Sequence, residues 1–276
     1  MQAKRVALVT GSTDGLGRAV ALALAASGFE VLIHGRDAQR GGELVRQISG
    51  QGGSATFHRA DFASLAQVRA LAESVRGAHD RLHLLINNAG VGTGQGGGPA
   101  PRQTSADGHE LRFAVNYLAG YLLTRLLLPT LVRGAPARIV NVSSAGQYPL
   151  DFDNLMLTRA YSGMRAYAQS KLAQIMLTLD LAAQLRDKGV TVNCLHPATY
   201  MDTTMVRAAG AKPMSTVEEG TAAVMGLAVS KELAGHTGGY FDGLRPARAN
   251  AQAYDPQVRQ RLAAVSASLA GLDPAP

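Results

Sequence analysis

The chain has 276 residues, of which 46% are hydrophobic and 17% are charged, a balance typical of a folded globular protein and not of a disordered one. Its net charge of +7 comes from lysines and arginines that are scattered along the sequence. They form no stripe interleaved with aromatic residues, which are only 5% of the chain, so the composition argues against a nucleic-acid partner.

The first predicted element is a buried parallel strand over residues 6–10, a short run of apolar and β-branched side chains. A strand this close to the first residue leaves no room for a signal peptide. The single cysteine, Cys194, excludes an intrachain disulfide and favours a reducing compartment. We therefore expect a cytoplasmic protein.

A glycine-rich turn follows this strand and leads into a predicted helix over residues 18–27; its sequence is Gly11-Ser12-Thr13-Asp14-Gly15-Leu16-Gly17. In a strand–turn–helix unit, Gly11 permits the tight turn, Gly15 lets the backbone approach a pyrophosphate, and Gly17 lets helix and strand pack closely. The helix N-terminus then points free N–H groups at the anion. We predict that this segment binds a dinucleotide.

The residues after the second predicted strand, 31–34, bear on the choice between NAD and NADP. An enzyme that selects NAD usually has an Asp or Glu here, which binds the ribose hydroxyls and repels a 2′-phosphate. In this chain the position is Gly35, and Arg36 follows it. Because a guanidinium can bind a 2′-phosphate and stack on adenine, we favour NADP(H) over NAD(H) as the cofactor. The alternative is that Arg36 is a surface residue at a helix start, with Asp37 as the N-cap.

Strands and helices alternate along the rest of the chain. The predicted strands are 55–59, 84–87, 138–143, 191–196 and 239–241, and the predicted helices are 40–49, 65–76, 108–133, 165–188 and 217–230. The apolar stretch 118–132 contains Arg125 and Pro129, so we interpret it as a buried helix and not as a membrane span. The alternation predicts an α/β fold, a single Rossmann domain over residues 1–276 with a doubly wound parallel sheet and helices on both faces.

Tyr167 and Lys171 lie four residues apart on the predicted helix 165–188, so their side chains share a face. An ammonium fixed over a phenol stabilises the phenolate, which a free tyrosine forms only at about pH 10. A tyrosine held in this way can protonate a carbonyl oxygen or accept a proton from an alcohol. Because such pairs also occur by chance on solvated helices, the significance of this one depends on the dinucleotide motif elsewhere in the chain.

Together these motifs resemble the classical short-chain dehydrogenase/reductases over residues 4–245. The residues that carry the resemblance are Thr10, Gly11, Gly15 and Gly17, the run Asn87-Asn88-Ala89-Gly90, Asn116, the strand 140–144, and Tyr167 with Lys171. The resemblance implies hydride transfer between a nicotinamide cofactor and a carbonyl or alcohol, with Asn116, Ser144, Tyr167 and Lys171 as the catalytic residues. It also implies cofactor contacts from Asp61, Phe62, Asn88, Ala89, Gly90, Tyr167, Lys171, Pro197 and Thr199. For Asp61, a helix N-cap is the alternative.

The interval between Ser144 and Tyr167 is longer than in the compact family pattern. The added segment, residues 147–165, resembles the branch of the retinol dehydrogenases and the WW-domain oxidoreductases, which tends to prefer NADP. Residues 198–216 are expected to form a substrate lid, and their methionines suit a fairly apolar substrate. Classical relatives often form dimers through the long helices after the fourth and fifth strands, so a homo-oligomer is one expectation.

A non-catalytic alternative is an NADP(H)-binding redox sensor or regulatory protein. Such a protein needs the cofactor site but has no need of the complete set of Asn116, Ser144, Tyr167 and Lys171. We expect no metal site, because His79 and His83 are four residues apart but have no matching third ligand in the surrounding sequence.

Overall fold

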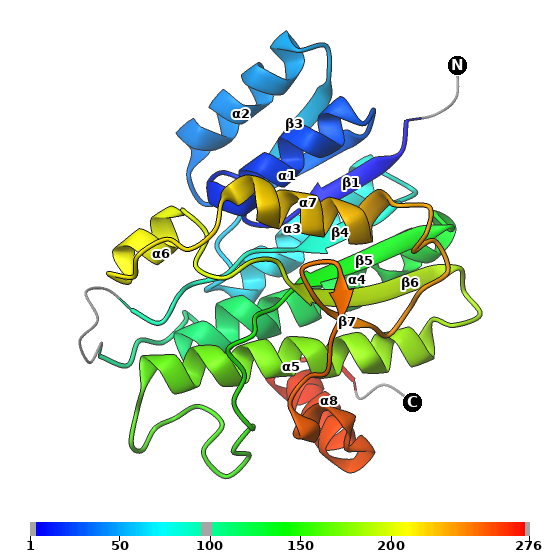
Figure 1. The fold of residues 1–276 in the computed structure, drawn as a ribbon. Helices are drawn as coiled ribbons and strands as arrows, with labels where there is room; N and C mark the ends of the chain where they lie inside the picture. The colour runs from blue at the N-terminus through cyan, green and yellow to red at the C-terminus, as the bar shows by residue number, and fades with distance from the viewer. Residues whose placement is uncertain (1–3, 95–100, 274–276) are drawn as a thin grey trace.

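A central eight-stranded sheet organises the computed structural model, which describes residues 4–94 and 101–273 (Figure 1). The strand order is β3-β2-β1-β4-β5-β6-β7-β8, and every neighbouring pair is parallel except β7 with β8. The strands are β1 (Val6–Val9), β2 (Glu30–Gly35), β3 (Ser54–Arg59), β4 (Leu84–Asn87), β5 (Ala137–Val142), β6 (Val190–His196), β7 (Tyr240–Asp242) and β8 (Arg245–Pro246). The predicted α/β, doubly wound arrangement is confirmed.

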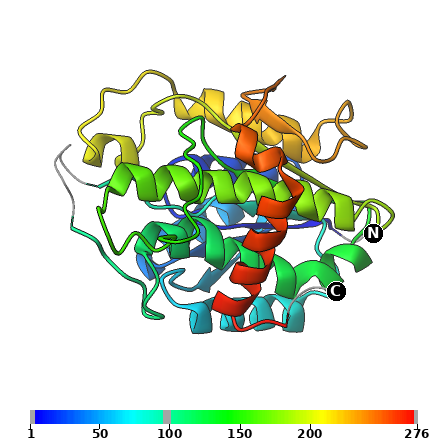
Figure 2. The same ribbon diagram turned by 90° about the horizontal axis from the view of Figure 1, so that it is seen from below.

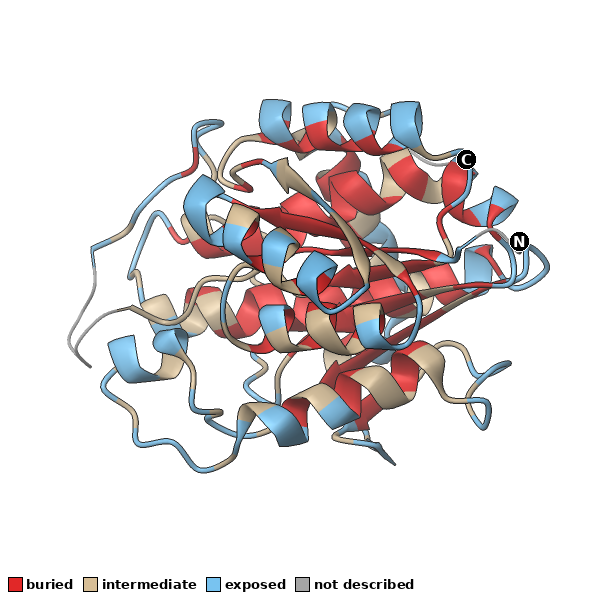
Figure 3. Ribbon diagram, turned by 90° about the horizontal axis from the view of Figure 1, so that it is seen from above, coloured by how far each residue is buried: buried red, intermediate tan, exposed pale blue. Residues whose placement is uncertain are grey.

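Helices cover both faces of the sheet and enclose two apolar cores (Figures 1 and 3). One face carries α1 (Gly15–Ala26), α2 (Ala38–Gly50) and α7 (Val217–Val229), and the other carries α3 (Leu65–Ala78), the π-helix η1 (Phe113–Leu118), α4 (Ala119–Arg133) and α5 (Gly163–Gln184). Figure 3 shows that the buried residues are on the sheet and on the helix faces turned toward it. This burial explains why β1, β4 and β5 read as nearly continuous apolar runs.

One helical stretch, Phe113–Arg133, is long and apolar enough to cross a membrane, with a mean hydropathy of 1.3 in the window tested. However, 61% of that window is buried inside the fold. Phe113 and Tyr117, for example, are fully enclosed in the core. The stretch is therefore a core helix of the kind expected from the sequence, and the cytoplasmic location stays a prediction.

The C-terminal segment contains two elements for which the sequence patterns give no expectation, the 3-10 helix η2 (Ala251–Tyr254) and α8 (Pro256–Leu269). Seen from below, α8 crosses the outer side of α5 (Figure 2). Arg259 Nε lies 2.7 Å from Asp180 Oδ1 on α5, and the Tyr117 hydroxyl lies 2.7 Å from Ser266 Oγ. The C-terminal helix thus covers part of the helix face that the family resemblance associates with dimers.

The two segments expected near the substrate differ in regularity. Residues 147–161 form turns and extended loops, and α5 begins after Ser162, whose side chain accepts a hydrogen bond from Arg165 N. The expected lid, 198–216, contains the short helix α6 (Thr204–Ala208). The sequence is also rich in glycine over residues 92–98, of which residues 95–98 lie outside the described residues.

Candidate active site

The glycine turn after β1 has the geometry that its sequence predicts. Gly11 and Gly15 have φ of 63° and 51°, in the left-handed region that favours glycine. A Cβ on Gly11 would lie 2.8 Å from Ala89 Cα, and a Cβ on Gly17 would collide with the Gly11 carbonyl oxygen and with Asn88. The turn therefore forms a cradle closed by backbone on one side, with the N-terminus of α1 pointing into it.

Residues of the second motif, after β4, hold this turn in place. Asn88 Nδ2 donates to the carbonyl oxygens of Thr10 and Gly11 at 2.9 and 3.1 Å. The backbone N–H groups of Asn88 and Ala89 both donate to Thr10 Oγ1. The structure thus brings Asn88, Ala89 and the glycine turn together as predicted, but the Asn88 side chain is used to support the turn.

His34, at the end of β2, is a supporting residue that sequence reasoning missed. Gly11 N donates to His34 Nδ1 at 3.1 Å, so the ring proton is on Nε2, which lies 3.2 Å from the Ala60 carbonyl oxygen. Burial lowers the pKa of His34 to about 4, which keeps it neutral. The Phe62 ring stacks on His34 with centroids 4.3 Å apart and is itself buried, so its side chain belongs to the core. The sequence signal that could have identified His34 is a polar residue inside an otherwise apolar strand.

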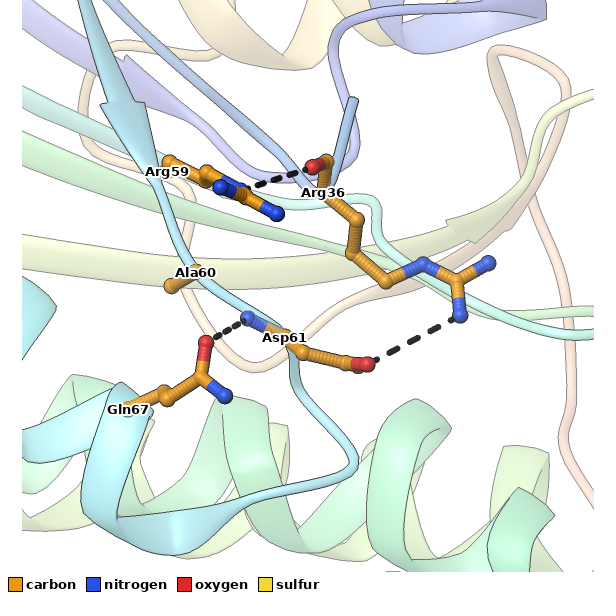
Figure 4. A pocket seen from close by; sticks show the side chains of 5 residues that line it. All are labelled: Arg36, Arg59, Ala60, Asp61 and Gln67. Atoms are coloured by element: carbon orange, nitrogen blue, oxygen red, sulfur yellow. Dashed lines mark hydrogen bonds and ion pairs between the residues drawn. The ribbon is translucent and has the colours of Figure 1, made fainter. Parts of the chain in front are cut away.

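A cavity of about 400 Å³ lies beside the ends of β2 and β3; it is lined by Arg36, Arg59, Ala60, Asp61 and Gln67 (Figure 4). Arg36 Nη1 lies 3.9 Å from Asp61 Oδ2, and Arg59 Nε donates to the Arg36 carbonyl oxygen at 3.2 Å. Asp61 is not a helix cap, since Ser64 caps α3. Sequence reasoning predicted Arg36 and Asp61 here but missed Arg59.

Gly35 is closed to any side chain. A Cβ at this position would lie 2.5 Å from Thr13 Cγ2 and 2.7 Å from Thr13 Oγ1. An acidic residue that binds ribose hydroxyls cannot stand here without displacing Thr13. Asp37 is the N-cap of α2, accepting from Arg40 N at 3.1 Å, which leaves Arg36 as the charged residue of this run that faces the cavity.

Ser144 and Tyr167 meet at the carboxyl edge of the sheet, one after β5 and the other on α5. A Cβ on Gly146 would lie 3.5 Å from Ser144 Oγ and 3.9 Å from Tyr167 Cε1, so the two side chains adjoin the same place. Gly146 N donates to Ser144 Oγ at 3.1 Å, which fixes the serine. Ser143 is buried and donates to the Lys171 carbonyl oxygen at 2.8 Å, which leaves Ser144 as the serine beside Tyr167; its catalytic role stays a prediction.

Lys171 lies one turn after Tyr167, with its Nζ 5.6 Å from the centroid of the phenol ring. Burial lowers the pKa of Lys171 to about 7. Burial also raises the pKa of Tyr167, an effect that the nearby Ser144 side chain partly offsets. Burial is therefore the largest influence on the pKa of Tyr167 in this structure and outweighs the lowering expected from Lys171.

Asn116 is on the π-helix η1, where it fastens the loop after β4 to α5. Its Oδ1 accepts from Val91 N at 2.7 Å, and its Nδ2 donates to Val91 O at 3.1 Å and to Ser170 Oγ at 3.0 Å. A Cβ on Gly90 would lie 3.3 Å from Asn116 Oδ1 and 3.7 Å from Lys171 Nζ. Asn116, Gly90 and Lys171 therefore adjoin one another, as predicted.

The expected lid adjoins both the glycine turn and the loop after β4. A Cβ added to Gly15 would lie 3.3 Å from Thr203 Cγ2. A Cβ added to Gly92 would lie 3.0 Å from Met205 Cγ. Thr203 therefore adjoins the glycine turn, although it was not among the residues predicted to contact the cofactor. Pro197 is buried at the end of β6, and the Thr199 hydroxyl lies 3.1 Å from His196 Nε2, so this hydroxyl already has a partner.

A buried ion pair connects the segment 147–165 to the loop after β4. Arg112 donates from Nε to Gly92 O and from Nη2 to Thr93 O, both at 2.8 Å. Its Nη1 lies 3.5 Å from Glu110 Oε1, which also accepts from the Tyr161 hydroxyl at 3.1 Å. Both charged side chains are buried, so the pair fixes the position of the loop after β4.

The residues at the carboxyl edge of the sheet fit a nicotinamide dinucleotide. The glycine cradle at the α1 N-terminus suits a pyrophosphate, and the cavity at Arg36 suits the adenosine end. Ser144, Tyr167 and Lys171 lie at the same edge, after β5 and on α5. In the described part of the chain, no group of three His, Cys, Asp or Glu side chains is placed to hold a metal ion.

Comparisons with known proteins agree with this geometry. The family model described as short chain dehydrogenase matches residues 5–213. Human retinol dehydrogenase 13 is 36% identical over 98% of this chain and 85% of its own length, and polyprenol dehydrogenase from Mus musculus is 38% identical over the same shares. The Pseudomonas aeruginosa RhlG/NADP active-site complex superposes with a TM-score of 0.70 at 28% identity, covering 87% of this chain and 95% of that one. The chain therefore belongs to the short-chain dehydrogenase family, in the retinol-dehydrogenase-like branch.

Proposed function

We propose that the protein is an NADP(H)-dependent oxidoreductase that interconverts a carbonyl and an alcohol on a fairly apolar substrate, with Tyr167 as the acid–base residue. The observation that carries the proposal is the convergence of Ser144 and Lys171 on Tyr167 beside the glycine cradle. A dinucleotide cradle alone would suit a sensor equally well. Nothing in the site favours the sensor over the enzyme.

In carbonyl reduction, Tyr167 donates its phenolic proton to the substrate oxygen, and the Ser144 hydroxyl donates a hydrogen bond to the same atom. A nicotinamide dinucleotide supplies the hydride in this chemistry. The raised pKa of Tyr167 keeps the phenol protonated at neutral pH, which supports reduction. Alcohol oxidation requires the phenolate, so its rate should rise with pH.

The preference for NADP(H) is supported by the two positions after β2. Gly35 has no space for the acidic side chain that selects NAD, and Arg36 offers a guanidinium at the cavity. Arg59 adds a second positive charge at the same cavity, so the two arginines exceed the single carboxylate of Asp61. A solved structural neighbour, the RhlG complex, contains NADP.

An apolar substrate is supported by the lid. Tyr200, Met205 and Met214 expose large apolar side chains there, between 41% and 72% of their surfaces. The relatives with the names retinol dehydrogenase and polyprenol dehydrogenase point to long apolar alcohols or aldehydes as the first substrates to try.

Cofactor binding followed by turnover tests the proposal. NADPH and NADH binding are measured by calorimetry, and NADPH oxidation is then followed with all-trans-retinal and a panel of apolar ketones and aldehydes. Tyr167→Phe should bind NADPH as the wild type does and lose turnover by at least about 100-fold. Tyr148→Phe, which alters an exposed tyrosine within the segment 147–165, is the matched control. NADPH binding without turnover on any substrate would favour the sensor.

A further inference from the structure

Lys171 holds a positive charge in a place that provides little to stabilise it. Its side chain is only 5% exposed, and an ammonium has three N–H donors but no acceptor. Among the described residues, no carboxylate lies within ion-pair distance of Nζ. A buried ammonium without a counter-ion is costly unless neutral acceptors take its protons.

Two neutral oxygens accept these hydrogen bonds. The Val142 carbonyl oxygen lies 2.9 Å from Lys171 Nζ, and Gln174 Oε1 lies 3.1 Å from it. The first belongs to the backbone at the end of β5 and would be present with any residue there. The second depends on the side chain at position 174. Gln174 is three residues after Lys171 on α5, so the two side chains share a helix face.

The orientation of the Gln174 amide follows from chemistry. Since an ammonium can only donate, the amide atom that faces Lys171 has to be the oxygen. Gln174 is itself buried, with 4% of its surface exposed, so water does not readily replace it as the acceptor. The side chain thus extends the stripe of Tyr167 and Lys171 by one further position on the same helix face.

A neutral amide also differs from a carboxylate in its effect on Tyr167. An amide oxygen stabilises the ammonium by its dipole but adds no net charge. A glutamate at the same place would form an ion pair with Lys171. Its negative charge would cancel much of the positive field that Lys171 exerts at the Tyr167 phenol. Glutamine is therefore the residue type that holds the ammonium and leaves its charge available.

We propose that Gln174 is a positioning residue that holds the Lys171 ammonium between Tyr167 and Gly90. The catalytic meaning of this inference rests on the proposed function, but the contact itself does not. Neither the family motif nor the names of the relatives assign a role to this position.

The titratable groups near the Lys171–Tyr167 pair include two tyrosines and one cysteine. Tyr167 shares its helix face, Tyr200 of the lid interacts with Tyr167, and Cys194 on β6 is buried beside α5. Burial raises the pKa of Tyr167 and of Cys194. A change in the titration of Lys171 after substitution of Gln174 can therefore be attributed to the lost or altered acceptor.

The test measures the titration of Lys171 directly in the folded full-length protein. Lysine labelled with ¹³C at Cε gives one NMR signal per residue, and the other lysines are Lys4, Lys188, Lys212 and Lys231. Lys171→Met identifies the signal of Lys171. Gln174→Met keeps the side-chain length but removes the acceptor, and Gln174→Glu replaces it with a charged one. Gln184→Glu, at the exposed end of the same helix, is the matched charge control.

Loss of one charge-assisted hydrogen bond should lower the titration midpoint of Lys171 by about one to two pH units in Gln174→Met. Gln174→Glu should raise it by at least about one unit, and Gln184→Glu should leave it unchanged. With all-trans-retinal and NADPH, the alkaline limb of the pH–rate profile should move in the same directions. Midpoints within about 0.3 units of the wild type in both folded Gln174 variants would overturn the inference. Absence of retinal turnover in the wild type would count against the proposed function, while the NMR midpoints would still decide the role of Gln174.

Discussion

Arg36 offers the sharpest test of cofactor preference, because its removal should alter binding with little effect on the fold. Its side chain is 70% exposed, and its ion pair with Asp61 is long, at 3.9 Å, and open to solvent. Exposed pairs of this kind contribute about 0–1 kcal/mol to stability. We therefore expect Arg36→Ala to unfold at nearly the wild-type denaturant concentration.

The effect on NADPH should be much larger. A guanidinium that binds a phosphate forms charge-assisted hydrogen bonds, and such bonds contribute about 1.5–3 kcal/mol each. The loss of one of them corresponds to a decrease of about 10- to 200-fold in NADPH affinity. NADH has no 2′-phosphate, so its affinity should change by less than about threefold, the share due to stacking on adenine.

Calorimetry or the fluorescence of the bound nicotinamide gives both dissociation constants, and the latter is favoured because the chain contains no tryptophan. Arg46→Ala, an exposed arginine of α2 outside the cavity, is the control for a general loss of positive charge. An Arg36→Ala protein with an unchanged ratio of NADPH to NADH affinity would refute the assignment of the 2′-phosphate to this side chain. Equal loss of both cofactors would instead place Arg36 at the adenine alone.

Three further predictions follow from the site. Ser144→Ala should lower kcat by about 100- to 1,000-fold with NADPH affinity unchanged, and a matching loss of affinity would contradict its place at the substrate oxygen. Gly17→Ala should cost about 1–3 kcal/mol in denaturant unfolding and weaken NADPH binding, because its Cβ meets the Gly11 carbonyl oxygen. The pKa of His34 is lowered to about 4 in the fold, so between that value and 6.5 the unfolded chain binds more protons and stability decreases as pH falls. From pH 7 to pH 5 the loss should be about 2 kcal/mol, and unfolding curves of His34→Gln, compared with the wild type, should lack this part of the pH dependence.

The parts of the fold that could be predicted are those coded over short stretches. The glycine turn is one example, because Gly11, Gly15 and Gly17 each answer a local demand of backbone angle or close approach. The Tyr167–Lys171 pair is another, since helix periodicity alone puts the two side chains on one face. The Ser143 hydroxyl is taken up by the Lys171 carbonyl oxygen of α5, which leaves Ser144 next to Tyr167.

The parts that could not be predicted depend on contacts between distant segments. His34 supports Gly11 only because β2 pairs beside β1, and Arg59 reaches the cavity only because β3 lies next to β2. The buried pair of Glu110 and Arg112 joins two loops whose backbone no periodicity describes. The packing of α8 across α5 depends on Arg259 and other contacts that no motif signals.

Burial of Lys171 lowers the free energy of unfolding at and below neutral pH. Its pKa is lowered from 10.5 to about 7, so between these values the unfolded chain binds more protons and stability increases with pH. Below about pH 7 the burial of the ammonium therefore costs several kcal/mol. A methionine would fill the same space without that cost, and Lys171→Met should stabilise the protein at neutral pH. Because packing would favour methionine, the lysine at this position is best explained by the charge that it places beside Tyr167.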